Sequence, residues 1–406
     1  MTDGIGLYGS SGSKISNNAN GKISISSPSQ NGIGIAGFLT GTSAQEYGTD
    51  KLISNLIATG GGNLPSTVKT IDITNNGEIE ISGKAVGIYA DNTSEIAGFD
   101  NHVTKENAVV NNNASLSFSG DKSVGIYAKK AIVNLSGTGK DDISVGKNGI
   151  GVATEDSTVN LLTDYGFQIK DNGVGLYAKN TDTSTGTMNV RYTGATTEAG
   201  TGAYFKGTGS NSLTNKLDIN VDNVSNTTKG MIGIYAKDAN FTNEGDIQVI
   251  NTDTLGFGII AINNLVPNTK VINKGNITLG DSLNPREPNI GMYTREKIIP
   301  QELPYILENK GNIKVGKNGI GIYGVAGKIT VENTHKVEVT AAGTGMYLTG
   351  NSYLDGGKLK LENKTVGTPA AGIYYKKGTS SDEVTHNTDL EVVSGSNLLT
   401  LYADGG

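Results

Sequence analysis

The sequence of 406 residues has no cysteine and no tryptophan, and it has only eight prolines. Without cysteine the chain can form no disulfide bond, no thiolate nucleophile and no cysteine-ligated zinc site. Arginine occurs only at Arg191, Arg286 and Arg295, and the formal net charge is −6. Nucleic-acid-binding proteins usually carry a basic stripe, so we expect no nucleic-acid partner. The calcium-binding nonapeptide repeat is also absent, and we expect neither a metal nor a cofactor.

Long apolar runs are missing as well. No stretch of about 20 apolar residues could form a membrane-spanning helix. Met1-Thr2-Asp3 leads directly into Gly4-Ile5-Gly6 without the charged and apolar segments of a signal peptide. The chain begins and ends inside a repeat pattern, so we expect it to be a segment of a longer protein.

Glycine is abundant, with 58 residues, and Asn, Thr, Ser, Ile and Val are frequent. β-branched residues suit half-buried strands, and Gly and Asn suit the backbone of tight turns. A chain several times longer than a typical domain of ~100–150 residues contains either several domains or one solenoid. This composition favours the solenoid.

An apolar-Gly-apolar-Tyr motif recurs through the chain and is often extended to Gly-Ile-Gly-Ile-Tyr-Ala. Most successive copies lie 24 to 33 residues apart, which suits a coil of three short strands joined by turns of variable length. The motif glycines are Gly6, Gly34, Gly87, Gly125, Gly151, Gly175, Gly202, Gly233, Gly258, Gly291, Gly321, Gly345 and Gly372.

A second motif, an Asn followed four and six residues later by apolar residues, lies between copies of the first. Asn75 before Ile79 and Ile81 is an example. The polar residues in between give the period-two alternation of a strand with one buried face. Coils stacked about 4.8 Å apart would pair every strand with its neighbours. The sequence therefore predicts an all-β fold, a right-handed parallel β-helix of about thirteen coils that forms one continuous segment over residues 1–406.

Two columns of equivalent side chains should stack along such a solenoid. Each Asn amide is expected to bond the next one along the axis. In Ile320-Gly321-Ile322-Tyr323 the isoleucines are expected inside, and Tyr323 outside together with Gly321. Exposed rings could bind sugars, but stacking of the rings on one another is the preferred interpretation. The ladder residues are Asn75, Asn243, Asn273, Asn309, Asn333, Tyr8, Tyr89, Tyr127, Tyr177, Tyr204, Tyr235, Tyr293, Tyr323, Tyr347 and Tyr374.

Three departures from the repeat, at about 37–68, 91–108 and 281–307, predict surface loop insertions, which in solenoids commonly carry binding. The first contains a possible short helix at 49–58. For each insertion a linker or packing loop is the preferred interpretation, and a binding loop is the alternative. The candidate ligand-binding residues within them are Tyr47, Phe99, His102, Arg286, Arg295 and Tyr305.

Parallel β-helices also include polysaccharide lyases and hydrolases, whose sites need two or three carboxylates in one groove. Glu78 and Glu80 alternate with buried positions, as solvated strand residues do. No cluster of carboxylates recurs on one face. We therefore expect no catalytic residue and no enzyme, and keep a polysaccharide-degrading enzyme as an alternative.

The recurring Gly-Ile-Gly-Ile-Tyr-Ala and Asn-x-Gly-x-Ile-x-Val units, in a chain rich in Asn and Lys, resemble the passengers of type V autotransporters. They look most like the very large fusobacterial adhesins, and the resemblance covers nearly the whole chain at the level of the repeat. It implies a passenger that is exported through a C-terminal outer-membrane barrel and displayed on the bacterial cell surface, anchored in the outer membrane or secreted. The barrel and the signal peptide are not among these residues, so anchoring is implied by the resemblance alone.

The expected function is therefore that of an adhesin segment that attaches to host cells or to other bacteria, through sugar or protein receptors. No obligate oligomer is expected. A spacer without recognition of its own remains an alternative, and the sequence does not name the receptor.

Overall fold

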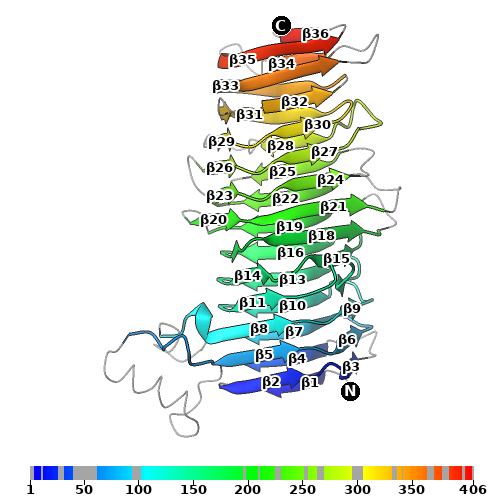
Figure 1. Ribbon diagram of the computed structural model, residues 1–406, viewed down its shortest axis with the longest axis vertical. Coiled ribbons are helices and arrows are strands. Elements are labelled where there is room, and N and C mark those ends of the chain that lie inside the picture. Colours follow the sequence, from blue (N-terminus) through cyan, green and yellow to red (C-terminus); the bar gives the residue numbers. More distant parts are fainter. Residues whose placement is uncertain are drawn as a thin grey trace. The chain divides into compact units, whose positions relative to one another are not determined.

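The computed structural model describes residues 4–10, 12–25, 32–39, 62–93, 102–194, 198–208, 211–224, 230–250, 255–262, 269–294, 305–331, 336–340, 342–363, 370–376, 384–395 and 398–404 (Figure 1). The chain forms two compact units, residues 1–191 (unit 1) and 192–406 (unit 2). Each is described separately below. Among the described residues no helix is both long and apolar enough to cross a membrane.

Each coil of unit 1 contributes one strand to each of three faces. The tyrosine face contains the strands of the Gly-apolar-Tyr motif: β1 (Gly4–Gly9), β4 (Gly32–Phe38), β7 (Ala85–Asp91), β10 (Val124–Lys129), β13 (Ile150–Glu155) and β16 (Val174–Lys179). The asparagine face contains β2 (Ser13–Asn17), β5 (Ile71–Asn75), β8 (Ala108–Asn112), β11 (Ile132–Leu135), β14 (Thr158–Leu161) and β17 (Asp182–Thr183). The third face contains β3 (Lys22–Ile25), β6 (Glu78–Ile81), β9 (Leu116–Phe118), β12 (Ile143–Ser144) and β15 (Tyr165–Ile169). A 3-10 turn, η1 (Lys105–Asn107), precedes β8, and β18 (Gly186–Tyr192) reaches the boundary of the unit.

Unit 2 repeats this plan. Its tyrosine face contains β19 (Gly200–Lys206), β22 (Met231–Lys237), β25 (Phe257–Ile262), β28 (Ile290–Thr294), β34 (Ala370–Lys376) and β36 (Leu398–Asp404). Its asparagine face contains β20 (Ser212–Asn215), β23 (Asn240–Asn243), β26 (Lys270–Asn273) and β29 (Tyr305–Asn309). Its third face contains β21 (Leu217–Asn223), β24 (Ile247–Ile250), β27 (Ile277–Leu279), β30 (Ile313–Val315) and β32 (Lys336–Thr340). Three longer strands, β31 (Ile320–Val331), β33 (Thr344–Asn363) and β35 (Val384–Gly395), run through corners and contribute to more than one face.

Equivalent strands of successive coils pair in parallel and bring equivalent residues together. On the tyrosine face of unit 1, Ile88 faces Ile35 and Ile126, and Ile126 faces Val152. All four side chains are completely buried. This stacking confirms the predicted parallel β-helix, since one coil alone could not bury its inward Ile and Val side chains. The last strand of the tyrosine face, β36, keeps Tyr402 of the motif but has Thr400 where the motif has glycine.

The motif glycines face the core rather than the outer surface, so that part of the prediction is wrong. Gly321 is buried next to Ile322, while Tyr323 is only half-buried. A Cβ on Gly321 would lie 2.5 Å from the carbonyl oxygen of Gly345 and would overlap the buried side chain of Val337. The strict alternation of the strand is broken at this position because successive coils approach closely, and only glycine leaves room for the neighbouring carbonyl.

The two predicted insertions of unit 1 meet at their bases. The Leu64 N–H donates to the His102 carbonyl oxygen at 2.7 Å, and Leu39, Leu64 and Val103 form a small buried cluster. Buried Asn107 in η1 donates from its amide to the Pro65 carbonyl oxygen at 2.9 Å. These contacts make residues 62–70 and 102–107 packed structure rather than open loops. The predicted helix at 49–58 lies outside the described residues.

The third predicted insertion, 281–307, is not a single loop, and this prediction is wrong. The complete strand β28 and the first residues of β29 lie within it. Ile290 faces both Phe257 and Ile320, as a regular member of the tyrosine face does. Pro285 and Pro288 precede the strand and do not interrupt it. Gly291 belongs to the repeat motif, which predicts a strand here, whereas the nearby prolines suggested a loop. The motif was the correct guide.

Candidate functional site

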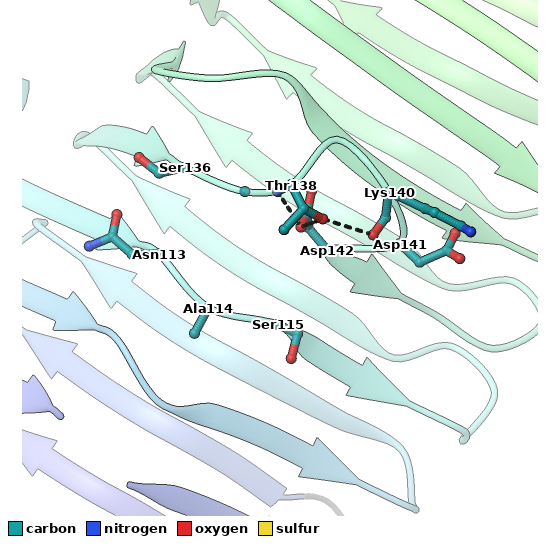
Figure 2. Close-up of a pocket in the computed structure, with 9 residues that line it drawn as sticks. Asn113, Ala114, Ser115, Ser136, Thr138, Lys140, Asp141 and Asp142 are labelled. Atoms are coloured by element: carbon teal, nitrogen blue, oxygen red, sulfur yellow. Dashed lines mark hydrogen bonds between the residues drawn. The ribbon is translucent and has the colours of Figure 1, made fainter. Parts of the chain in front are cut away.

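One turn of unit 1 is longer than its neighbours and creates a pocket. Residues 136–142 join β11 to β12, whereas residues 113–115 and 162–164 make the same connection in the adjacent coils. The long turn and residues 113–115 enclose a pocket of about 430 Å³ (Figure 2). Its lining residues are Asn113, Ala114, Ser115, Ser136, Gly137, Thr138, Lys140, Asp141 and Asp142.

The buried carboxylate of Asp142 holds the long turn in place. Its Oδ1 accepts from the Thr138 N–H at 2.8 Å and from the Thr138 hydroxyl at 3.0 Å. Its Oδ2 accepts from the Gly139 N–H at 3.0 Å and from the Gly166 N–H at 2.8 Å. With four donors already bound, this carboxylate is an internal cap of the turn and offers little to a ligand.

The second carboxylate of the pocket is also engaged. Asp141 forms an ion pair with Arg191, and both side chains are partly buried. Asp141 has a positive φ of 53°, a backbone conformation that Asp and Asn adopt more readily than most residues. The ion pair uses Asp141 Oδ2, and the buried Asp141 Oδ1 has no hydrogen-bond partner among the described residues. Because the Asp142 carboxylate is fully engaged, the pocket does not present the pair of available acids that glycoside hydrolysis requires.

Other polar groups of the pocket remain available to a ligand. The Lys140 ammonium and the Ser115 and Ser136 hydroxyls form no hydrogen bond or ion pair with another described residue. Asn113 donates to Asn76 at 2.8 Å. Figure 2 shows Asn113 and Ser115 on one side of the pocket and Ser136 and Lys140 on the other. The arrangement can bind a small polar group through hydroxyls and one cation, without aromatic stacking.

The structure describes only some of the six ligand-binding residues predicted in the insertions. Tyr47, Phe99 and Arg295 lie outside the described residues, and only the backbone of Tyr305 is described, as part of β29. His102 Nδ1 lies 3.1 Å from the Gly62 carbonyl oxygen. Since a carbonyl only accepts, this contact places a proton on Nδ1 and ties the two insertions together. Arg286 is exposed on a turn, where its backbone N–H donates to the Asn284 side chain at 3.0 Å.

The tyrosine rings on the outer surface stack on one another in separate groups. In unit 1, Tyr89 and Tyr127 lie 5.0 Å apart, and Phe38 fills the place between Tyr8 and Tyr89. Ala153 faces both Tyr127 and Tyr177 and interrupts the column. In unit 2, Tyr204 stacks on Tyr235, Ile260 interrupts, and a longer group follows: Tyr293, Tyr323, Tyr347, Tyr374 and Tyr402.

Partial burial within these stacks raises the pKa of the tyrosine hydroxyls. The pKa of both Tyr127 and Tyr323 rises to about 12, mainly through desolvation and further through neighbouring charges and phenols. The ring faces within a group are covered by neighbouring rings, so a sugar has little access to them. Stacking within the column is therefore the principal role of these rings.

The asparagine side chains form buried ladders. In unit 1, Asn17 donates to Asn75 at 2.8 Å, and Asn75 donates to Asn112 at 2.7 Å. In unit 2 the same bonds join Asn215, Asn243, Asn273 and Asn309 at 2.8, 2.8 and 2.9 Å. These are the bonds that the sequence pattern predicted for Asn75, Asn243, Asn273 and Asn309, whereas Asn333 lies outside the described residues. Asn17, Asn112 and Asn215 are further members that were not named from the sequence. Asn112 and Asn215 keep the apolar spacing, whereas Asn17 departs from it because Gly21 stands at the first apolar position.

The pocket was missed by sequence reasoning, although a signal for it exists. Leu135 and Ile143 border a longer polar stretch than Asn112 and Leu116 do in the preceding coil. A comparison of turn lengths at one corner of the coil would have found it. No protein-family model, curated protein or solved structure matches this chain.

Proposed function

We propose that this chain is a segment of a bacterial surface adhesin that attaches to host cells or other bacteria by binding their glycans or proteins, without chemistry. The observation that carries the proposal is the pocket formed by the long turn of unit 1. Its ammonium and hydroxyl groups are available to a ligand, whereas its carboxylates are engaged. Polar groups that line one pocket on a repeat scaffold suit recognition of a polar ligand.

Several properties of the chain support this function over others. The net charge of −6 and the scarcity of arginine disfavour nucleic acid. The engaged carboxylates Asp141 and Asp142 disfavour hydrolysis of the bound ligand. Display on the cell surface, with an anchor in a part of the protein beyond these residues, is the arrangement in which such a segment would meet receptors. This localisation is part of the proposal and is supported by the resemblance of the repeats to autotransporter passengers.

The experiment is binding of the tagged chain to a glycan array, to host-cell receptors and to partner bacteria. The double variant Ser115→Ala/Lys140→Ala should weaken binding by about tenfold or more, because two hydrogen-bonding groups of the pocket are lost. Lys170→Ala removes an exposed lysine of unit 1 outside the pocket and is the matched control. Equal binding of the double variant and the control would remove the pocket as the site.

A structural spacer is the second candidate. The observation that favours it is the asparagine ladder, in which the polar side chains satisfy one another and offer nothing to a partner. A folded chain that binds none of the glycans, receptors or bacteria would favour the spacer. Release of new reducing ends from a bound polysaccharide would favour an enzyme instead.

A further inference from the structure

Charged residues that face each other across neighbouring strands generally carry opposite signs. Since directly facing like charges destabilise a sheet, this alternation stabilises the stack of coils. The pattern holds within both units, for the facing pairs Lys14 and Asp72, Lys22 and Glu78, Asp91 and Lys129, Lys129 and Glu155, Glu155 and Lys179, Lys314 and Glu338, Glu338 and Lys360, Lys360 and Glu391, and Lys376 and Asp404.

Lys206 in β19 faces Lys237 in β22 and departs from this pattern. On its other side Lys237 faces Ile262, which brings no charge. Among the described residues, Lys336 and Lys358 also face each other within a unit, and there Lys358 is compensated by Glu391 at 2.8 Å. Neither Lys206 nor Lys237 forms an ion pair or a hydrogen bond through its side chain with another described residue. Asp238, the acidic residue directly after β22, is buried.

Two tyrosines share this surface with the lysines. Tyr204 and Tyr235 lie two residues before Lys206 and Lys237, so all four side chains project from the same side of their strands. The rings are stacked, with centroids 4.9 Å apart and planes 8° from parallel. All four side chains are half-buried, so part of each one reaches the surface.

The spacing of the two strands suits one oxyanion. Neighbouring strands lie about 4.8 Å apart, so two parallel lysine side chains can each donate to a different oxygen of one carboxylate or sulfate. In unit 1 the carboxylate of Glu155 lies between Lys129 and Lys179 and compensates both charges. An anion bound between Lys206 and Lys237 would play the same part in unit 2.

We propose that Lys206 and Lys237, beside the stacked rings of Tyr204 and Tyr235, bind the carboxylate or sulfate group of an acidic glycan. The choice of a glycan over another anion rests on the proposed attachment function. This site is separate in chemistry from the pocket of unit 1, which has one lysine and no aromatic side chain.

The decisive variant is Lys206→Glu, because it restores the alternation of charge. The melting temperature of the full chain should rise, since a repulsive pair becomes an attractive one. Binding to acidic glycans should at the same time fall by at least about tenfold, since the anion now meets a carboxylate. A purely structural role of these lysines would change stability and leave binding unchanged. Lys170→Glu makes the same charge change elsewhere on the surface and is the control.

The binding probes are polygalacturonate, which carries only carboxylates, dextran sulfate, which carries only sulfates, and uncharged dextran. The unsubstituted chain should prefer one of the acidic polymers to dextran, and which one identifies the anionic group. Equal binding of all three polymers, or undiminished binding by Lys206→Glu, would overturn the proposal. If Lys206→Glu does not fold, Lys206→Gln/Lys237→Gln removes both ammonium groups without adding a charge, and the same loss of binding is expected.

This experiment separates the site from the general function. If Lys206→Glu binds cells and acidic polymers as well as the unsubstituted chain does, the lysine site is wrong and attachment through another surface stands. If the unsubstituted chain binds no cell, receptor or glycan, the adhesive function fails together with the site.

Discussion

Unit 1 and unit 2 share one coil plan but differ in which column of side chains is complete. In unit 2 the asparagine ladder runs through four successive coils, from Asn215 to Asn309. In unit 1 it stops at Asn112, because Leu135 and Leu161 stand at the next two positions. For the charged residues the order of the two units is reversed. On the tyrosine face of unit 1 the facing charges alternate in sign, whereas in unit 2 Lys206 faces Lys237.

The interruption in unit 1 is closed by another side chain. Tyr165 in β15 is completely buried, and its hydroxyl accepts from the Asn112 amide at 2.8 Å. Burial raises the pKa of this hydroxyl far above its usual value, so it stays protonated. Each buried asparagine amide therefore needs a hydrogen-bond acceptor, but the acceptor can be either the next asparagine or a tyrosine hydroxyl. The largest energetic differences are therefore expected where a partner cannot be replaced.

The largest effect is expected for Asn243→Ala in unit 2. The substitution removes the acceptor of the Asn215 amide and the donors to Asn273 and to the Gly245 carbonyl oxygen. Buried groups left without partners should lower the free energy of unfolding by about 3 kcal/mol. Denaturant unfolding measures this loss. Asn312→Ala, an exposed asparagine bonded to Asn276, should cost less than about 0.5 kcal/mol. Equal losses for the two variants would mean that the buried ladder contributes no more than a surface amide.

A smaller effect is expected for Tyr165→Phe in unit 1. The ring still fills its buried site, but the Asn112 amide keeps only the Ala114 carbonyl oxygen at 2.8 Å as an acceptor. The free energy of unfolding should fall by about 1–2 kcal/mol. Tyr127→Phe removes a hydroxyl from the outer tyrosine column and should be nearly neutral. If Tyr165→Phe is as harmless as this control, the hydroxyl does not close the ladder.

The smallest effect is expected for Glu155→Gln. Lys179 donates to Glu155 at 2.7 Å, and Lys129 faces the same carboxylate from the other side. Because these side chains are partly exposed, the loss should be about 0.5–1 kcal/mol and should shrink at high salt. Lys206→Glu in unit 2 should change stability with the opposite sign. If both Glu155→Gln and Lys206→Glu lower the free energy of unfolding, the lysine pair of unit 2 is not a repulsive contact.

Much of the fold was predictable because the repeat motif reports directly on local backbone and packing. Tyr323 and its equivalents located the tyrosine face, and Asn243 and its equivalents located the buried turns. The inward position of Gly321 was not predictable from alternation, because the close approach of the next coil breaks the alternation there. The facing of Lys206 and Lys237 could have been predicted, because each lysine lies four residues after a motif glycine, Gly202 and Gly233. It was missed because the residues that follow the motif tyrosine were not compared between coils.

The candidate site was predictable only in part. Loop insertions were located from their length, but length does not say whether a segment packs or stays open. His102 packs against the other insertion, and the segment near Arg286 contains a regular strand. The pocket depends on four residues of difference between two turns, 136–142 and 113–115, which is too small a change to register as an insertion. Such a feature becomes visible only when coils are compared position by position.

The asparagine ladder keeps successive coils aligned although the coils differ in length. Successive ladder residues are 58 and 37 positions apart in unit 1 and 28, 30 and 36 apart in unit 2. The bonds between them nevertheless stay within 2.7 to 2.9 Å. Doubling a loop adds only about 0.6 kcal/mol of closure entropy, so chain between two ladder residues is inexpensive. Each stretch between ladder residues can therefore be exchanged as a cassette, and foreign peptides could be displayed there while the coils above and below keep their places.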